Sequence, residues 1–128
     1  MGFRESPHNQ PMEFVHLLGL HTLVEYVGGN REVLARADAL EPILLTAVEI
    51  CGATYVDHRI NQFSPYGASG VILIAESHMS FHSWPEHNYM ALDLFTCSST
   101  MDPTEAIDYI AEKIEAQTFH TRVLQRGY

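Results

Sequence analysis

The sequence predicts an α+β fold: a two-layer sandwich in which helices cover one face of a largely antiparallel β-sheet. Six segments have the apolar alternation or short apolar run of strands, and two longer segments carry an apolar stripe with helical spacing. Along the chain they follow the order strand, helix, four strands, helix, strand. With 128 residues, 46% of them apolar, the chain can build one core, and we expect a single domain over residues 1–128.

The first predicted strand and helix occupy the N-terminal part of the chain. The strand is expected at 17–27, before a Gly-Gly pair. The helix that follows has apolar residues at helical spacing and stops at Gly52. Asp38 followed by Glu41 resembles a capping box, which predicts Asp38 as the N-cap and places Pro42 in the first turn. A start at Asn30 would instead leave Pro42 as a kink inside the helix. Its stripe consists of Leu40, Leu44, Ala47, Val48 and Cys51.

The remaining elements follow from short apolar runs and the turn residues between them. The segment 71–76 is apolar on both faces, as expected of a central strand. A turn is expected at 64–67, and 85–88 separates two further strands. The second helix is expected at 103–117, with Asp102 as its N-cap. The five later strands are expected at 54–63, 71–76, 79–84, 89–97 and 119–124.

Charge and composition disfavour several classes of function. The formal net charge of −9, from 16 acidic and seven basic residues, disfavours nucleic acid and anionic membranes as partners. It suits a cationic small ligand, while on charge alone the usual interpretation of an acidic surface is that it confers solubility. Residues 1–12 are expected to be a loose leader without the apolar centre of a signal peptide, and no apolar run is long enough for a membrane span. We therefore expect a cytoplasmic protein.

The cysteines and the lysine restrict the chemistry further. Cys51 and Cys97 lie far apart without a CxxC spacing, which disfavours a disulfide framework or a structural zinc site. The single lysine, Lys113, lies off the apolar stripe of its helix, whereas a pyridoxal-phosphate enzyme needs a buried, placed lysine. Amino-acid chemistry in this chain would need a different electron sink.

The most informative segment is 71–86, an apolar strand that runs into a Glu76–Ser77 bond followed by a His-rich stretch. Together with Phe63 to Gly70 and with Asp93 to Cys97, it resembles the short bacterial and archaeal S-adenosylmethionine decarboxylases. The similarity covers Leu18 to Arg126. It implies a self-processing proenzyme whose covalent pyruvoyl cofactor forms from Ser77, so that cleavage after Glu76 yields a β chain, 1–76, and an α chain, 77–128.

The resemblance also implies a role for each matching residue. His82 matches the processing histidine, and Ser69 matches the second processing residue, a hydroxyl that stabilises the cyclic intermediate. Cys97 matches the proton donor that acts after carbon dioxide leaves. Phe63 matches the aromatic that stacks on adenine, and Glu86 the acid that holds the ribose hydroxyls.

Strand alternation conflicts with one part of this assignment. Ser77 and His82 have opposite parity, so a break or bulge between them is required if both side chains are to reach one site. His78, His82 and Glu86 are also spaced by four, which on a helix would suggest zinc. Phe81, Trp84 and Pro85 favour strand and turn instead, so we expect no metal.

The implied reaction is decarboxylation of S-adenosylmethionine, through a Schiff base with the pyruvoyl group, to the aminopropyl donor for spermidine synthesis. Family members that decarboxylate arginine or ornithine by the same chemistry provide the alternative. A non-cleaving regulatory or ligand-binding homologue is the third possibility. The resemblance further implies a homodimer whose sites draw residues from both chains, and it leaves any activator open.

Overall fold

A six-stranded sheet forms the body of the molecule, in a computed structural model that describes residues 18–97 and 101–127. The strand order is β2-β3-β4-β5-β1-β6, and every neighbouring pair is antiparallel. The strands are β1 (Gly19–Val27), β2 (Tyr55–Gln62), β3 (Ala68–Ile74), β4 (Ser77–Trp84), β5 (Tyr89–Thr96) and β6 (Thr118–Arg126).

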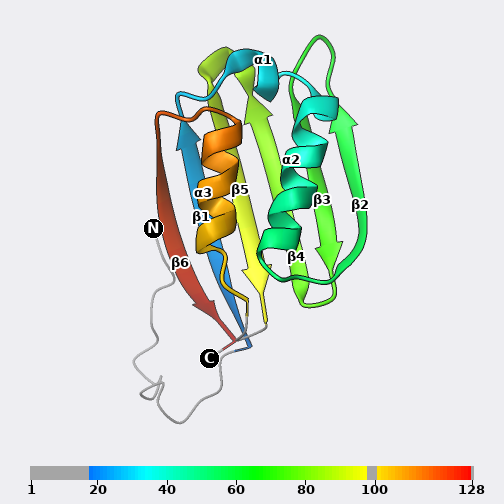
Figure 1. The fold of residues 1–128 in the computed structure, drawn as a ribbon, viewed down its shortest axis with the longest axis vertical. Coiled ribbons are helices and arrows are strands. Elements are labelled where there is room, and N and C mark those ends of the chain that lie inside the picture. The colour runs from blue at the N-terminus through cyan, green and yellow to red at the C-terminus, as the bar shows by residue number, and fades with distance from the viewer. Residues whose placement is uncertain (1–17, 98–100, 128) are drawn as a thin grey trace.

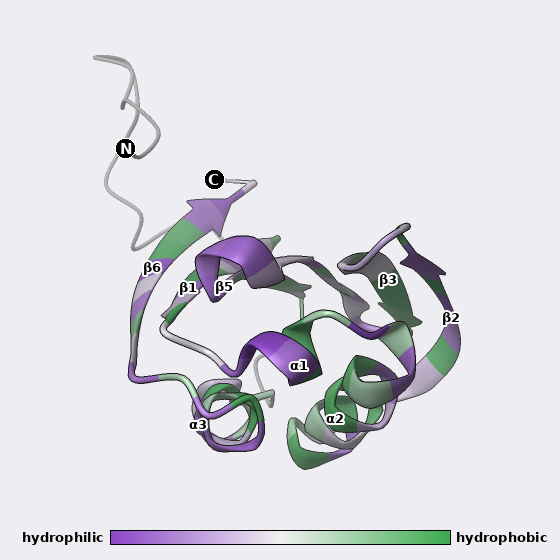
Figure 2. Cartoon of the chain, turned by 90° about the horizontal axis from the view of Figure 1, so that it is seen from above, coloured by the Kyte–Doolittle hydropathy of each residue, from purple (hydrophilic) through white to green (hydrophobic). Residues whose placement is uncertain are grey.

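The two longer helices lie side by side on one face of this sheet (Figures 1 and 2). They are α2 (Ala37–Ile50) and α3 (Thr104–Lys113), and a short helix, α1 (Arg31–Leu34), precedes them. The predicted α+β architecture, with helices on one face of an antiparallel sheet, is confirmed. No helix among the described residues is both long enough and apolar enough to cross a membrane.

The predicted start of the first long helix is wrong. Asn30 caps the unpredicted helix α1, because its Oδ1 accepts hydrogen bonds from Glu32 N at 2.8 Å and Val33 N at 3.1 Å. Helix α2 begins after Arg36, and Asp38 lies in its first turn, where the carboxylate pairs with the Arg36 guanidinium at 2.9 Å instead of capping the helix. Pro42 consequently lies inside the helix, beyond its first turn.

The second long helix begins close to its predicted start and is shorter than predicted. Asp102 Oδ1 accepts a hydrogen bond from Thr104 N at 3.0 Å, so this side chain caps the first turn although the N-cap position is Pro103. The helix ends at Lys113, and Glu115 adopts a positive φ of 58° in the connection that leads to β6.

The core lies between the sheet and the helices. Along β4 and β5, buried side chains alternate with half-buried ones, as expected for strands with one covered face. The Tyr26 hydroxyl reaches across from β1 and donates to the Ile107 carbonyl of α3 at 2.9 Å. The fully buried side chains include Leu40 and Leu44 from α2, Ile110 and Ile114 from the region of α3, and Ile72, Met79, Met90 and Leu94 from the sheet.

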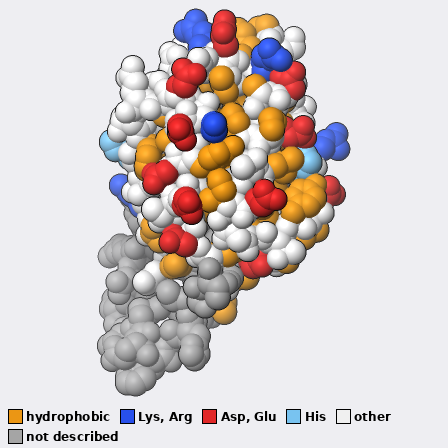
Figure 3. Space-filling view, in the orientation of Figure 1, with side chains coloured by type: hydrophobic (Ala, Val, Ile, Leu, Met, Phe, Trp, Pro, Cys, Tyr) orange, Lys and Arg blue, Asp and Glu red, His pale blue; other side chains and the backbone are white. Residues whose placement is uncertain are grey.

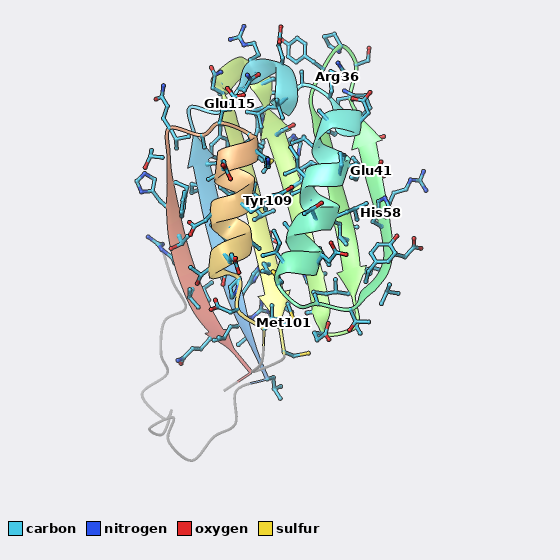
Figure 4. All side chains as sticks on the ribbon, in the orientation of Figure 1. Arg36, Glu41, His58, Met101, Tyr109 and Glu115 are labelled. Atoms are coloured by element: carbon cyan, nitrogen blue, oxygen red, sulfur yellow. The ribbon has the colours of Figure 1, made fainter. Side chains whose placement is uncertain are left out.

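Polar contacts fasten α2 to the edge strand β2. His58 lies between two partners, because its Nε2 is 2.6 Å from Glu41 Oε2 and its Nδ1 is 2.7 Å from the Tyr55 hydroxyl (Figure 4). Elsewhere on this helix-covered side, Asp and Glu side chains are scattered among apolar ones (Figure 3). No helix of the described residues covers the opposite face, called here the open face of the sheet (Figure 2).

Replacing the buried Ile110 by Ala should lower the free energy of unfolding by about 2–5 kcal/mol, because it removes apolar contacts and leaves a cavity between α3 and the sheet. Glu112→Ala changes an exposed residue of the same helix and serves as the control, with an expected effect within about 0.5 kcal/mol. Urea denaturation monitored by circular dichroism measures both. Equal effects of the two substitutions would contradict the described core.

Candidate active site

The Glu76–Ser77 bond lies in the tight turn between β3 and β4. Strand β3 begins earlier than predicted and ends at Ile74, so Ala75 and Glu76 form a two-residue turn and Ser77 is the first residue of β4. The earlier start depends on Gly70, because a Cβ there would lie 2.6 Å from the Arg59 carbonyl oxygen of β2. Ser77 pairs with Ile74 across the turn and is half-buried.

Cys97 reaches the carbonyl of the residue before Ser77. The register of β4 with β5 pairs Ser77 with Thr96, which places the next residue, Cys97, beside Glu76. The backbone N–H of Cys97 donates to the Glu76 carbonyl oxygen at 3.3 Å, and its thiol donates to the same oxygen. The carbonyl that Ser77 Oγ would attack is therefore held by two donors, an arrangement suited to stabilising developing negative charge.

Thr54 holds the side chain of the same glutamate. Glu76 Oε1 accepts a hydrogen bond from Thr54 N at 3.1 Å, and Oε2 accepts one from Thr54 Oγ1 at 3.2 Å. The backbone N–H of Thr54 is the main cause of a pKa for Glu76 below its usual range. We call Thr54, Glu76, Ser77 and Cys97 the cleavage group.

Four other candidate residues lie at the far end of β4. Ser69 of β3 pairs directly with His82 of β4, so both side chains emerge on the open face. The His82 ring stacks between two aromatic rings, with centroids 5.4 Å from Phe63 and 4.0 Å from Trp84. Glu86 follows in a single 3-10 turn, η2 (Pro85–His87), and is exposed. We call Phe63, Ser69, His82 and Glu86 the distal group.

The expected break or bulge between Ser77 and His82 is absent, and this expectation is corrected. Strand β4 pairs with β3 and β5 without a register shift from Ser77 to His82. Alternation therefore directs Ser77 toward the helix side and His82 to the open face. Five residues of extended chain also separate them by about 17 Å. Within one chain, the structure does not bring the cleavage group and the distal group together.

Gln62 fixes the turn that carries Phe63. Its Nε2 donates to the carbonyl oxygens of Ala35, Phe63 and Gly67 at 2.9–3.0 Å, and its Oε1 accepts from Ala37 N at 2.6 Å. One side chain thus joins β2, the 64–67 turn and the start of α2. Sequence reasoning missed this role, since all the bonds except that to Phe63 reach residues that are not adjacent along the chain.

A polar cluster on the open face was also missed. Ser80 Oγ donates to Asp93 Oδ1 at 2.6 Å, and His21 Nε2 lies 3.7 Å from the same oxygen. That nitrogen of His21 is buried and has no hydrogen-bond partner among the described residues, while Nδ1 lies 3.2 Å from Arg126 Nη1. The cluster draws on β1, β4, β5 and β6, and only the fold unites these strands.

The spacing of His78, His82 and Glu86 does not produce a metal site. On a strand, His78 and His82 lie about 13 Å apart along the chain axis, not one above the other as on a helix. Among residues 18–97 and 101–127, no three His, Cys, Asp or Glu side chains lie close enough together to hold a metal ion.

The comparison with protein-family models decides the family. The model described as S-adenosylmethionine decarboxylase matches residues 20–127, nearly the whole described chain. The chain belongs to the S-adenosylmethionine decarboxylase family. The resemblance on which the sequence analysis relied is thereby confirmed.

Curated relatives agree with this family. An S-adenosylmethionine decarboxylase proenzyme from Thermococcus onnurineus is 44% identical over 110 residues, which cover 86% of this chain and 78% of the relative. A protein of the same name from Thermosipho melanesiensis is 40% identical over 110 residues, covering 86% of this chain and 85% of the relative. Similar relatives therefore come from both archaeal and bacterial sources.

Solved structures agree with the fold. The adenosylmethionine decarboxylase of Aquifex aeolicus superposes with a TM-score of 0.82 at 33% identity, covering 89% of this chain and 94% of that one. A Trypanosoma brucei chain, AdoMetDC-delta26, superposes with a TM-score of 0.58 at 15% identity, over 81% of this chain and 45% of the longer one. The second likeness concerns the fold alone.

Alkylation should distinguish the two free cysteines. Burial raises the pKa of the Cys51 thiol to about 11, so at pH 8 it stays protonated as well as enclosed, whereas Cys97 is exposed. Iodoacetamide at pH 8 should label Cys97 in the folded protein and leave Cys51 unmodified, as read by peptide mass spectrometry. Unfolded protein, in which both react, is the control. Equal labelling of the folded protein would contradict the described burial.

Proposed function

We propose that this chain is a self-processing S-adenosylmethionine decarboxylase. It would cleave its own Glu76–Ser77 bond and convert Ser77 into the pyruvoyl cofactor. The observation that carries the proposal is the cleavage group: a serine directly after a tight turn, preceded by a carbonyl whose oxygen already accepts hydrogen bonds from the Cys97 backbone and thiol. The names and similarity of the curated relatives support the same activity.

Cleavage needs no reactant beyond the chain and water. Ser77 Oγ adds to the Glu76 carbonyl carbon, the C–N bond breaks, and an ester replaces the amide. Removal of the Ser77 α-proton then expels the Glu76 carboxylate, which leaves chain 1–76 and a dehydroalanine at the start of chain 77–128. Addition of water releases ammonia and produces the pyruvoyl group. When formed, that group supplies the electron sink that decarboxylation requires.

The protein's own residues would then bind the substrate and deliver a proton. Cys97 is exposed and lies next to the new N-terminus, and its thiol would return a proton to the α-carbon after carbon dioxide leaves. Phe63 is 38% exposed, and its ring, stacked on His82, would offer its remaining face to the adenine. The exposed carboxylate of Glu86 would accept hydrogen bonds from the ribose hydroxyls.

We further infer that the working unit is a homodimer with two composite sites. His82 is about 17 Å along β4 from Ser77 and on the other side of the sheet, too far to act on it within the chain. A second copy placed open face to open face, with its strands reversed by a two-fold axis, would bring its distal group to the end of the first copy's β4, against the open-face side of the Glu76–Ser77 backbone and beside Cys97. The pairing would also cover the His21, Ser80 and Asp93 cluster.

Arginine or ornithine decarboxylation is not favoured, since the relatives are named for S-adenosylmethionine and the distal group contains residues suited to adenine and ribose. A cytoplasmic location stays a prediction from the sequence. Self-cleavage distinguishes the enzyme from the alternative, a non-cleaving regulatory or ligand-binding homologue.

Purified protein should therefore show two polypeptides, 1–76 and 77–128, when its mass is measured under denaturing conditions. It should release carbon dioxide from S-adenosylmethionine and none from arginine or ornithine. Ser77→Ala should remain a single inactive chain, because the nucleophile is gone and little volume changes. A wild-type chain that stays intact and inactive would support the regulatory alternative, and turnover of arginine or ornithine alone would retain the pyruvoyl chemistry but reject the substrate.

Co-expression should test the composite site. His82→Ala retains Ser77, and Ser77→Ala retains His82, so each alone should stay uncleaved. In a mixed dimer, the His82→Ala chain should be cleaved because its partner supplies the imidazole. A partner carrying both substitutions is the matched control and should not rescue cleavage. The two chains carry different tags, so that intact mass shows which of them is cleaved. An uncleaved His82→Ala chain in the mixed dimer would contradict a site built from residues of both protomers.

A further inference from the structure

Thr54 makes three hydrogen bonds to the turn that contains the cleavage bond. Besides its two bonds to the Glu76 carboxylate, its carbonyl oxygen accepts one from Ala75 N at 2.8 Å. Thr54 lies in the connection between α2 and β2, which passes the β3–β4 turn at the lower end of the sheet in Figure 1. Both residues of the turn are thus attached to a segment about 20 residues earlier in the chain.

The carboxylate and the backbone carbonyl of Glu76 are hydrogen-bonded on opposite sides of the turn. Because the β3–β4 hairpin lies between β2 and β5, Thr54 approaches from the β2 side and Cys97 from the β5 side. The Glu76 carboxylate is held on the β2 side and its carbonyl oxygen on the β5 side. Rotation of the residue is restricted from both ends, and the carbonyl carbon is held in one orientation next to Ser77.

We propose that Thr54 is a positioning residue for self-cleavage, an inference that rests on the proposed function. Attack by Ser77 Oγ places negative charge on the Glu76 carbonyl oxygen, and the carboxylate of the same residue would repel that charge if it swung close. The two hydrogen bonds that Thr54 donates hold the carboxylate away from the Glu76 carbonyl oxygen. The same bonds hold the carbonyl carbon oriented for attack, which lowers the entropic part of the barrier.

Substitutions at Thr54 can separate the role of its hydroxyl from that of its shape. Thr54 is exposed, and its side chain contributes one of the two donors, while its backbone N–H contributes the other. Thr54→Val keeps the shape and removes only the hydroxyl, whereas Thr54→Ser keeps the hydroxyl and removes a methyl. Glu76→Gln keeps the size of the acceptor and removes its charge.

The experiment follows cleavage of freshly synthesised full-length chains over time by intact mass. Thr54→Val should cleave about tenfold more slowly than wild type, the loss expected for one hydrogen bond to a charged group. Thr54→Ser should cleave within about twofold of wild type. If Thr54→Val fails to fold, Thr54→Ala removes the same donor and gives the same readout. Thermal midpoints are compared in the uncleavable Ser77→Ala background, where Thr54→Val should leave the midpoint within about 2 °C.

The charge argument is tested by repeating Thr54→Val in the Glu76→Gln background, where its effect should shrink to about twofold, because the bond to the neutral amide oxygen is weaker and the substituted side chain carries no charge to repel the oxyanion. Cleavage of Thr54→Val at the wild-type rate overturns the proposal. So does an equal slowing in both backgrounds, or a failure of Thr54→Ser to restore the rate. If the wild-type chain itself does not cleave, the proposed function fails first, which separates the two conclusions.

Discussion

The register of β4 with its two neighbours is the constraint on which the rest of the structure depends. Ser77 pairs with Ile74 across the turn and with Thr96 across the sheet, and the ladders continue from there without a bulge. These pairings place Cys97 at the Glu76 carbonyl and Ser69 opposite His82 at the other end. Because side chains alternate along a strand, a slip of one residue would reverse the face of each of these groups.

That register places the cleavage group and the distal group at opposite ends of β4. The cleavage group contains the proposed nucleophile, the bond it would break and the two donors on the carbonyl that it would attack. The distal group contains the imidazole, the hydroxyl and the aromatic and acidic residues suited to a nucleoside. In the proposed homodimer, each chain would contribute its cleavage group to one composite site and its distal group to the other, across the uncovered face of the sheet.

Local pattern predicted the elements well where apolar periodicity is strong. The stripe of α2 and the alternation along β5 are determined by burial, which the sequence records directly. The predicted element boundaries are wrong where several hydrogen-bond partners compete for the same polar group. Asp38 fits a capping box but pairs with Arg36 instead, and the small residues from Ala68 to Gly70 extend β3 because neighbouring strands offer backbone partners that no local pattern reveals.

The sequence by itself determined the family and the α+β class and supplied the candidate reactive residues, because these depend on residue type and on spacing along the chain. Tertiary structure alone decided that Ser77 and His82 lie apart, that Thr54 holds Glu76, and that Gln62 fixes the turn of Phe63. The reason is physical. Strand register and hydrogen bonds between segments far apart in the chain depend on which backbone groups become neighbours after folding. The local order of side chains along the sequence does not specify those neighbours.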